Sequence, residues 1–351
     1  MPSIKDVAKH ANVSIATVSN VVNGTRYVSN ELRKKVLTVI DELDYEADHI
    51  ARSLKSNRTK TIGVLVTSIN RIFFPLIIKG IQAAASKYGY NLMLYSLEDS
   101  FEKEKEFVKM LAGLRVDGII IDTLADRSNE EYLKYIAKLK YGKKFIPVVS
   151  LERNLEEYGI SSVFVDNLAG GKLAVECLIK RGCQKIAFIK GPANSDIALD
   201  RFNAYKSTLE KHGLPFDERF VCSGDFSPIS GYSETKRLLL NGVEFDGMFA
   251  SNDQMAIGAI KSIKEHGLKV PDDVKLVGYD NTFVSSIVYP SLTTINVPKY
   301  RLGLEAFDIL HRLMKSGENA IDVKTVLLPT SLMIRNSTNS IGETNWDMED
   351  W

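Results

Sequence analysis

The chain has 351 residues, of which 44% are hydrophobic and 25% charged, and these values exclude a disordered, collagen-like or coiled-coil protein. No apolar run approaches the ~18 residues of a membrane-spanning helix, and the first residues lack the apolar stretch of a secretory signal peptide. We therefore expect a cytoplasmic protein without membrane contact, built from about two domains and a small module. Cys177, Cys183 and Cys222 lack the spacing of a zinc site or a disulfide framework, which predicts buried free cysteines and no metal.

The net charge of +1 hides an uneven distribution along the chain. Residues 1–60 contain ten lysines and arginines against seven aspartates and glutamates, whereas residues 61–351 contain 35 against 37. A basic end on a near-neutral body favours contact with nucleic acid, although solvated charge on a small helical module would give the same counts.

The beginning of the chain predicts short helices. Ser3, with a carboxylate three residues later, starts a helix over 4–11 whose apolar residues share one face. Asn12 is a turn residue that tolerates a left-handed backbone, and Ser14 is a second N-cap, after which 15–22 predicts a second helix. A third helix follows. Two helices joined by a three-residue turn are typical of a helix-turn-helix.

From Thr61 onward the period changes. Short apolar runs alternate with amphipathic segments of helix length, which predicts parallel crossovers and doubly wound α/β sheets. The predicted strands are 62–66, 90–95, 118–121, 145–149, 163–165, 185–189, 248–250 and 274–277, and the predicted helices are 73–88, 101–111, 170–181, 200–212, 229–240 and 254–266. A charged break over 151–161 predicts two similar lobes, with a ligand cleft between them beyond the carboxyl ends of the strands.

Many short motifs then follow one another in a single order. They are the run from Ile4 to Gly24, Arg33-Lys34-Lys35-Val36, Ala51-Arg52-Ser53-Leu54, Val116-Asp117-Gly118, Asp166-Asn167, Ser251-Asn252-Asp253, Val277-Gly278-Tyr279-Asp280 and Arg335-Asn336-Ser337-Thr338. With these motifs the chain resembles the lactose repressor and galactose repressor (LacI/GalR) family over about residues 3–338. The resemblance implies an all-α headpiece and a two-lobed α/β domain like that of periplasmic binding proteins. It implies a helix-turn-helix at 1–46, a hinge helix or linker at 47–60, an effector-binding and dimerisation domain at 61–338 and a flexible tail at 339–351.

The resemblance also implies which residues contact DNA. In the headpiece they are Ser14, Ile15, Ala16, Thr17, Ser19, Asn20 and Asn23, on or beside the helix that reads base edges in the major groove. Asn20 stands where many family members have arginine, so we expect a different half-site preference, with a solvent-facing Asn20 as the alternative.

The hinge contacts implied by the resemblance are Ala51, Arg52, Leu54 and Lys55. Leu54 is the wedge that opens a central base step from the minor groove, and the basic side chains neutralise phosphates. The sequence departs from the family pattern before the hinge, where the usual Pro-Asn is Ala47-Asp48. An aspartate is a sound helix N-cap, but it places an anion near DNA.

The resemblance places a small-molecule effector in the cleft between the lobes. The implied residues are Phe73, Phe74, Asp166, Arg201, Phe226, Asn252 and Asp280. Polar groups combined with aromatic rings suit a polyhydroxylated ligand. The structural alternatives are that Phe73 begins a core helix and that Asp280 caps a loop. Lys299 is a further cation near the cleft in relatives, and it leaves an anionic effector open.

The leading interpretation is therefore a sequence-specific transcriptional regulator, most often a repressor. As a homodimer it binds a palindromic double-stranded DNA operator, and a small molecule, a sugar or sugar derivative, controls it. No cofactor is expected. A solute-binding transport component is a second class, opposed by the helical module; a Rossmann-type enzyme is a third, opposed by the lack of phosphate-binding and catalytic motifs. A regulator that answers to a phosphorylated carrier protein stays open as a subclass.

Overall fold

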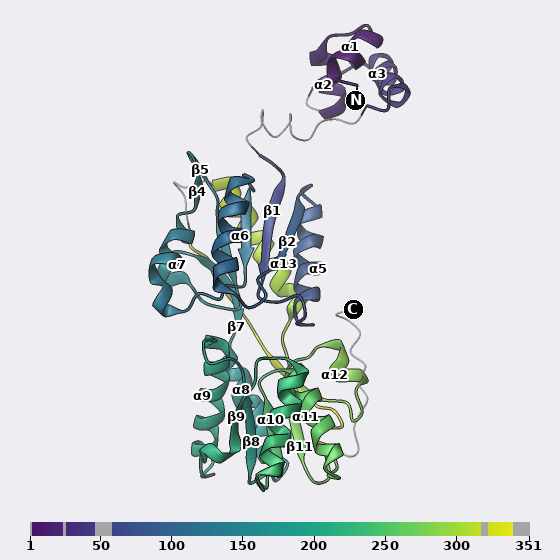
Figure 1. Ribbon diagram of the computed structural model, residues 1–351. Helices are drawn as coiled ribbons and strands as arrows, with labels where there is room; N and C mark the ends of the chain where they lie inside the picture. The colour runs from purple at the N-terminus through teal and green to yellow at the C-terminus, as the bar shows by residue number, and fades with distance from the viewer. Residues whose placement is uncertain (1, 24–25, 46–57, 317–321, 340–351) are drawn as a thin grey trace. The chain divides into compact units, whose positions relative to one another are not determined.

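The computed structural model describes residues 2–23, 26–45, 58–316 and 322–339 (Figure 1). The chain divides into two compact units, Met1–Thr59 and Lys60–Trp351, which we call the N-terminal unit and the C-terminal unit. The implied hinge contacts Ala51, Arg52, Leu54 and Lys55 lie outside the described residues, as do tail residues 340–351. What the sequence predicts for these two segments stays a prediction.

The described part of the N-terminal unit is helical. It contains α1 (Ile4–His10), α2 (Ile15–Asn23) and α3 (Asn30–Glu42). Asn12, in the turn between α1 and α2, has a left-handed φ of 50°, and the Ser14 hydroxyl accepts a hydrogen bond from the Thr17 amide at 3.1 Å. The small core consists of Val7, Ala8, Ala11, Val18, Val21, Val36 and Val39. The two helices and the turn predicted from the sequence are confirmed.

The described part of the C-terminal unit contains two six-stranded sheets. The first sheet has the order β13-β7-β6-β3-β1-β2 and all its pairs are parallel. The second has the order β14-β12-β11-β10-β8-β9 and is parallel except for β14, which runs antiparallel to β12. We call each sheet with its helices a lobe, and the predicted doubly wound α/β fold is confirmed.

The first lobe is built on strands that are buried on both faces. Ile62 and Val64 of β1 pack with the core on the α5 and α13 side, whereas Leu65 packs with the core on the α6 and α7 side. Its elements are β1 (Thr61–Val66), α5 (Phe74–Ser86), β2 (Asn91–Ser96), α6 (Phe101–Gly113), β3 (Gly118–Ile121), α7 (Glu130–Ala137), β6 (Val148–Leu151), β7 (Ser161–Val165), α13 (Lys299–Ser316) and β13 (Thr325–Leu328). A short hairpin of β4 (Lys140–Tyr141) and β5 (Lys144–Phe145) lies between α7 and β6 in the sequence.

The second lobe repeats this layering. Its sheet packs against α8 and α9 on one face and against α10 and α11 on the other. Its elements are α8 (Asn167–Lys180), β8 (Ile186–Lys190), α9 (Asp196–Lys211), β9 (Val221–Ser223), α10 (Pro228–Leu240), β10 (Gly247–Ala250), α11 (Asp253–Glu265), β11 (Lys275–Asp280), α12 (Phe283–Ile287), β12 (Thr293–Asn296) and β14 (Ser331–Met333).

The predicted boundary between the lobes is wrong. The charged break over 151–161 is a loop within the first lobe, because β7 follows it and pairs with β6, with Val149 opposite Ser161. The chain enters the second lobe only after Val165, returns to the first lobe after β12, and crosses again between β13 and β14 (Figure 1). Over the described ranges, three chain segments thus connect the lobes.

The same structure bears on two further expectations. All three cysteines are buried and free, as predicted. Among the described helices, none is both long enough and apolar enough to cross a membrane.

Candidate functional site

A cavity lies at the carboxyl ends of strands from both sheets. The space between its walls, open solvent at its mouth included, is about 420 Å³. The residues that line it are Arg71, Phe73, Phe74, Asp122, Glu152, Ile197, Arg201, Phe226, Asn252, Gln254 and Asp280. Each of them is the last residue of a strand or lies in the segment that follows one, which is where ligands of open α/β sheets bind.

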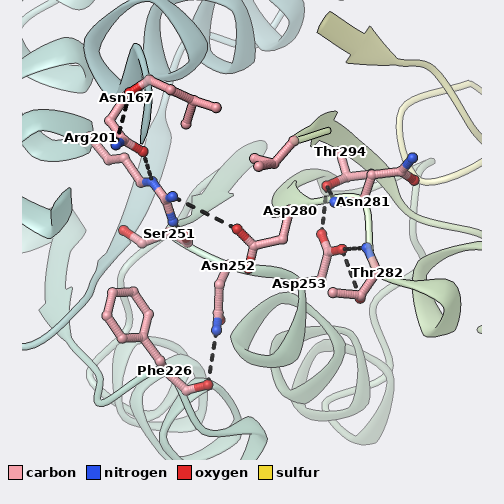
Figure 2. A network of polar contacts seen from close by, with 12 residues as sticks. Asn167, Arg201, Phe226, Ser251, Asn252, Asp253, Asp280, Asn281, Thr282 and Thr294 are labelled. Atoms are coloured by element: carbon pink, nitrogen blue, oxygen red, sulfur yellow. Dashed lines mark hydrogen bonds and ion pairs between the residues drawn. The ribbon is translucent and has the colours of Figure 1, made fainter. Parts of the chain in front are cut away.

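Arg201 on α9 is buried and held by several partners. Its Nε donates to Oδ1 of Asn167 at 3.0 Å, and its Nη1 donates to the carbonyl of Ser251. Its Nη2 lies 3.7 Å from Oδ1 of Asp280 (Figure 2). Its guanidinium carbon lies 3.6 Å from the centre of the Tyr279 ring. The cation is thus fixed in direction before any ligand binds.

Asp280 ends β11 on a left-handed backbone. Its φ is 102°, and that of Asn281 is 50°, both in the left-handed region. Lys299 Nζ donates to the carbonyls of both residues. Asp253 accepts from the amide and hydroxyl of Thr282 at 2.7 and 2.9 Å (Figure 2). Burial raises the pKa of Asp280 to about 7, although the neighbouring Arg201 opposes the rise.

Lys299 does not supply the cavity with a cation. It is buried, and its ammonium group donates to the carbonyls of Asp280, Asn281 and Val297. It is outside the set of described residues that lines the cavity. The anionic effector that the sequence left open on account of Lys299 therefore loses this support.

Three aromatic rings border the cavity. Phe73 and Phe74 pack edge to face with their centres 5.4 Å apart, at the start of α5. Phe226 has a φ of 70°, and its carbonyl accepts a hydrogen bond from Asn252 Nδ2 at 3.0 Å. The guanidinium of Arg71 lies 5.1 Å from the centre of the Phe226 ring. Such rings offer flat apolar surface on which a sugar face can stack.

Two residues that the resemblance implied have structural duties instead of, or besides, a ligand contact. Asn252 lines the cavity, but it also caps α11 by accepting from the Met255 amide at 2.9 Å. Asp166 caps α8 by accepting from the Ala169 amide at 2.8 Å, and its side chain is exposed. Asp166 is outside the cavity lining formed by the described residues.

Sequence reasoning missed two cavity carboxyls, Asp122 and Glu152. Each directly follows a buried strand, β3 or β6, and this position was the available signal. Burial raises the pKa of Asp122 to about 6, opposed by Arg71, and Oδ2 of Asp122 accepts from Thr67 at 2.9 Å. Burial and the charge of Asp122 raise the pKa of Glu152 to about 8.

Two side-chain bridges join the lobes beside the cavity. Gln254 on α11 accepts from the Ile72 amide at 3.0 Å and donates to the carbonyl of Asn70 at 3.4 Å. Arg153, which follows β6, pairs with Asp196 at the start of α9. The walls of the cavity and these two bridges therefore come from both lobes.

In the N-terminal unit, the start of α2 and the residue before it are exposed. Ile15 is 46% exposed, and Ser14 and Ala16 are exposed as well. Thr17, Ser19 and Asn20 are half-buried, and Asn23 is the last residue of the helix. Val18 is fully buried in the core, and Val22 packs against that core. In a helix-turn-helix the first residues of the second helix contact base edges, and in this unit residues 14–16 are exposed.

No described group of three or more histidine, cysteine, aspartate or glutamate side chains could hold a metal ion. A helix-turn-helix unit combined with a two-lobed α/β unit and an inter-lobe cavity is the architecture of a DNA-binding regulator with a ligand-binding domain. Comparisons with known proteins give the family.

Residues 3–48 match the family described as bacterial regulatory proteins, lacI family, and residues 175–338 match a periplasmic binding protein-like domain. The chain is 36% identical to the ribose operon repressor of Halalkalibacterium halodurans over 338 residues, which are 96% of this chain and 97% of the relative. It is 35% identical to the HTH-type transcriptional repressor PurR of Proteus mirabilis over 339 residues, with 96% and 97% covered.

Similar solved structures belong to the same class of regulators. The chain is similar to the lac repressor dimer bound to operator and the anti-inducer ONPF, with a TM-score of 0.86, 31% identity and coverage of 96% of this chain and 99% of that one. It is also similar to a complex of the transcriptional regulator CelR with cellobiose, with a TM-score of 0.71 and 30% identity, covering 96% and 100%. The chain belongs to the lacI family of bacterial regulatory proteins: it is a transcriptional regulator with a DNA-binding and a ligand-binding domain.

Proposed function

We propose that the protein is a cytoplasmic, non-enzymatic repressor that binds a palindromic operator as a homodimer and is controlled by a sugar in the inter-lobe cavity. The observation that carries the proposal is the cavity itself, which combines three aromatic rings with fixed charged groups at the strand ends of both lobes. The names of the relatives support it, since one is a ribose operon repressor and a similar structure holds cellobiose.

Dimerisation follows from the size of the reading unit. One helix-turn-helix covers only a half-site, so a palindromic operator requires two copies. Ser14, Ile15, Ala16, Thr17, Ser19, Asn20 and Asn23 contact DNA from α2 or its ends. The segment 47–60, with Ala51, Arg52, Leu54 and Lys55, is the hinge that enters the minor groove, and it joins the headpiece at 1–46 to the effector domain at 61–338.

The ligand controls DNA binding through the arrangement of the two lobes. A ligand that touches Phe73 and Phe74 on one side and Arg201, Phe226 and Asp280 on the other binds one lobe arrangement more tightly than the other. It therefore shifts the population of that arrangement by its difference in affinity, and with it the spacing of the two hinges.

The test is selection of bound duplexes from a randomised DNA pool by the full-length protein at ~150 mM salt, where non-specific binding is weak. We expect a palindrome with a flexible central pyrimidine–purine step. The same selection with Asn20→Ala should relax the preference at one base pair of each half-site. Enrichment of no consensus, both without ligand and with pooled sugars, would contradict the proposal.

A further inference from the structure

Positive charge gathers at the amino ends of four neighbouring strands of the first lobe. The strands β2, β1, β3 and β6 run parallel, so the segments that precede them meet at one end of the sheet. These segments are residues 58–60, 87–90, 114–117 and 138–147. They contain one acidic residue, Asp117, and eight basic residues, which we call the basic end of the first lobe: Arg58, Lys60, Lys87, Arg115, Lys138, Lys140, Lys143 and Lys144.

The charge of the basic end faces solvent. All eight residues are exposed except Lys144, which is half-buried. The acidic residue Asp117 is buried, and its two oxygens accept from Lys144 Nζ at 2.6 Å and from the Lys60 amide at 2.9 Å. Asp117 therefore neutralises one lysine, and the exposed surface of these four segments carries no carboxylate.

This surface of one sign differs from the rest of the C-terminal unit. Residues 61–351 contain 35 lysines and arginines against 37 aspartates and glutamates, and α6 mixes both signs along its length. Interspersed charges are usual on protein surfaces, whereas a cluster of one sign repels itself and attracts a polyanion. The basic end therefore suits a chain of phosphates.

The hairpin of β4 and β5 gives this surface a fixed shape. It lies at the same end of the lobe as the start of β1, to which Asp117 ties it, and the Arg115 guanidinium lies 5.0 Å from the centre of the Tyr141 ring (Figure 1). Lys138 directly precedes the hairpin, and Lys143 is in its turn. Among the described residues no carboxylate pairs with these two lysines, so their charge is available to a ligand.

The course of the chain brings this end of the lobe close to DNA. Lys60 directly precedes β1 and ends the segment 47–60, which the proposed function makes the minor-groove hinge. Only six residues lead from Leu54 to Lys60, and even a fully extended chain of that length spans roughly 20 Å. A hinge with Leu54 in the groove therefore holds the basic end within reach of the same duplex.

We propose that the basic end of the first lobe binds the phosphate backbone of the operator duplex, in addition to the phosphates that the headpiece and the hinge contact. The inference rests on the proposed function, because it requires the hinge to enter DNA. It assigns DNA contacts to the ligand-binding domain, with Lys138 and Lys143 at the hairpin as the contact residues. Since phosphates are the same in every sequence, these contacts add affinity and no sequence preference.

The test measures how salt weakens DNA binding by the full-length protein. Fluorescence anisotropy follows binding to a duplex of about 40 base pairs with the selected operator at its centre, and to a scrambled duplex of that length, at about 50–300 mM salt. Each phosphate contact adds about 0.9 to the slope of log affinity against log salt. Lys138→Gln combined with Lys143→Gln should lower this slope by about 1–2 and weaken binding at ~150 mM salt by about fivefold or more, on both duplexes.

Two matched double variants serve as controls. Lys138→Arg with Lys143→Arg keeps the charge and should keep the slope of the wild type. Lys236→Gln with Lys269→Gln removes the same charge from exposed positions of the second lobe and should also leave the slope unchanged. The unfolding temperature of each variant checks that it folds. An acidic protein as the partner of the surface would leave DNA binding untouched, so equal slopes for the wild type and Lys138→Gln/Lys143→Gln would overturn the proposal.

Ethylation interference on the operator duplex locates the contacts. We expect phosphates whose ethylation weakens binding of the wild type but not of Lys138→Gln/Lys143→Gln. An identical interference pattern for the two proteins would contradict a contact between this surface and the backbone.

Failure of this inference and failure of the proposed function are distinguishable. A protein that selects a palindrome, with the same salt slope in Lys138→Gln/Lys143→Gln, would refute only the role of the basic end. A protein that selects no consensus, but whose binding to the scrambled duplex loses slope in that variant, would refute only the sequence-specific repressor.

Discussion

Arg201 joins three separate elements of the second lobe while remaining almost fully buried. Its partners lie at the start of α8, after β10 and at the end of β11, through Asn167, Ser251 and Asp280. Because each partner belongs to a different element, the guanidinium fixes one wall of the cavity as a unit. Removing it should therefore affect stability and ligand response together.

Arg201→Met tests this coupling. Methionine keeps the unbranched stem but leaves Asp280 buried without the arginine that it pairs with, so we expect the free energy of unfolding to fall by about 3 kcal/mol. Urea denaturation measures the loss, and sugar-dependent release of the selected operator measures the response, which should disappear. Arg219→Met is the matched control, because Arg219 pairs with Asp217 at an exposed position, and neither property should change. An Arg201→Met protein as stable as the wild type would contradict the coupling.

Glu152 predicts a pH dependence with a definite sign. Its pKa is raised to about 8 in the folded protein from an ordinary value of 4.5, so its contribution to stability is most favourable below pH 4.5 and is lost as the pH rises toward 8. In Glu152→Gln this loss is absent. The variant should therefore gain stability over the wild type between pH 5 and pH 8.5, by an amount on the order of a few kcal/mol in urea denaturation. A difference that stays constant with pH would show that Glu152 ionises normally.

Some residues of the cavity can be predicted from the sequence, and others only from the folded structure. Arg201, Phe226, Asn252 and Asp280 came from matching motifs, and all of them line the cavity. Glu152 could have been found from its place after a buried strand. The bridge from Gln254 to Ile72 could not, because it joins residues 182 positions apart and depends on how two loops meet.

Among the elements, two helix pairs approach each other closely because each helix carries a glycine at the contact. A Cβ at Gly80 of α5 would lie 2.2 Å from the Tyr300 carbonyl oxygen, and a Cβ at Gly303 of α13 would lie 2.0 Å from that of Ile77. The pair α10 and α11 repeats the arrangement in the second lobe, where a Cβ at Gly258 would lie 1.9 Å from a backbone oxygen. These contacts fix the spacing of the helix layers.

Gly303→Ala should therefore force α5 and α13 apart. Since the obstacle is backbone, the added methyl has no flexible neighbour to displace, and we expect a loss of about 1–3 kcal/mol of unfolding free energy in urea. Gly113→Ala, at the end of α6, is the control, because no described atom lies within 4 Å of the added Cβ there. That variant should be neutral or slightly more stable. Equal stability of the two variants would mean that the helices can separate at little cost.

The alternation of strands and helices was readable because the strands are continuous apolar runs and the helices are amphipathic. The sequence does not show which of the two sheets a strand joins. Both β7 and β13 belong to the first sheet, although one follows the charged break and the other lies near the end of the chain. Local period carries no information about that choice, since pairing depends on contacts far apart in sequence. The helix α13, which covers the first sheet, was not predicted from the sequence either.

On the scale of the whole molecule, the two units have separate cores. The core of the N-terminal unit includes Val18 and Val36, and that of the C-terminal unit includes Val64 and Phe307. We therefore expect two unfolding transitions in calorimetry of the full chain. Val18→Ala should lower the free energy of unfolding of only the smaller transition, by about 2 kcal/mol, and should abolish operator binding. Val64→Ala should lower the free energy of unfolding of only the larger transition and leave the smaller unchanged. A single transition shifted by both variants would show that the units unfold as one.

The return of the chain to the first lobe also sets the order of events during synthesis. The outer edge of β7 pairs with β13, and α13 covers strands of the same sheet, so this lobe stays incomplete until residues 299–328 have left the ribosome. By then the strands of the second lobe up to β12 have already emerged. An uncovered strand edge is a template for pairing with other chains, and translational pausing before Thr325 should increase aggregation and dependence on chaperones.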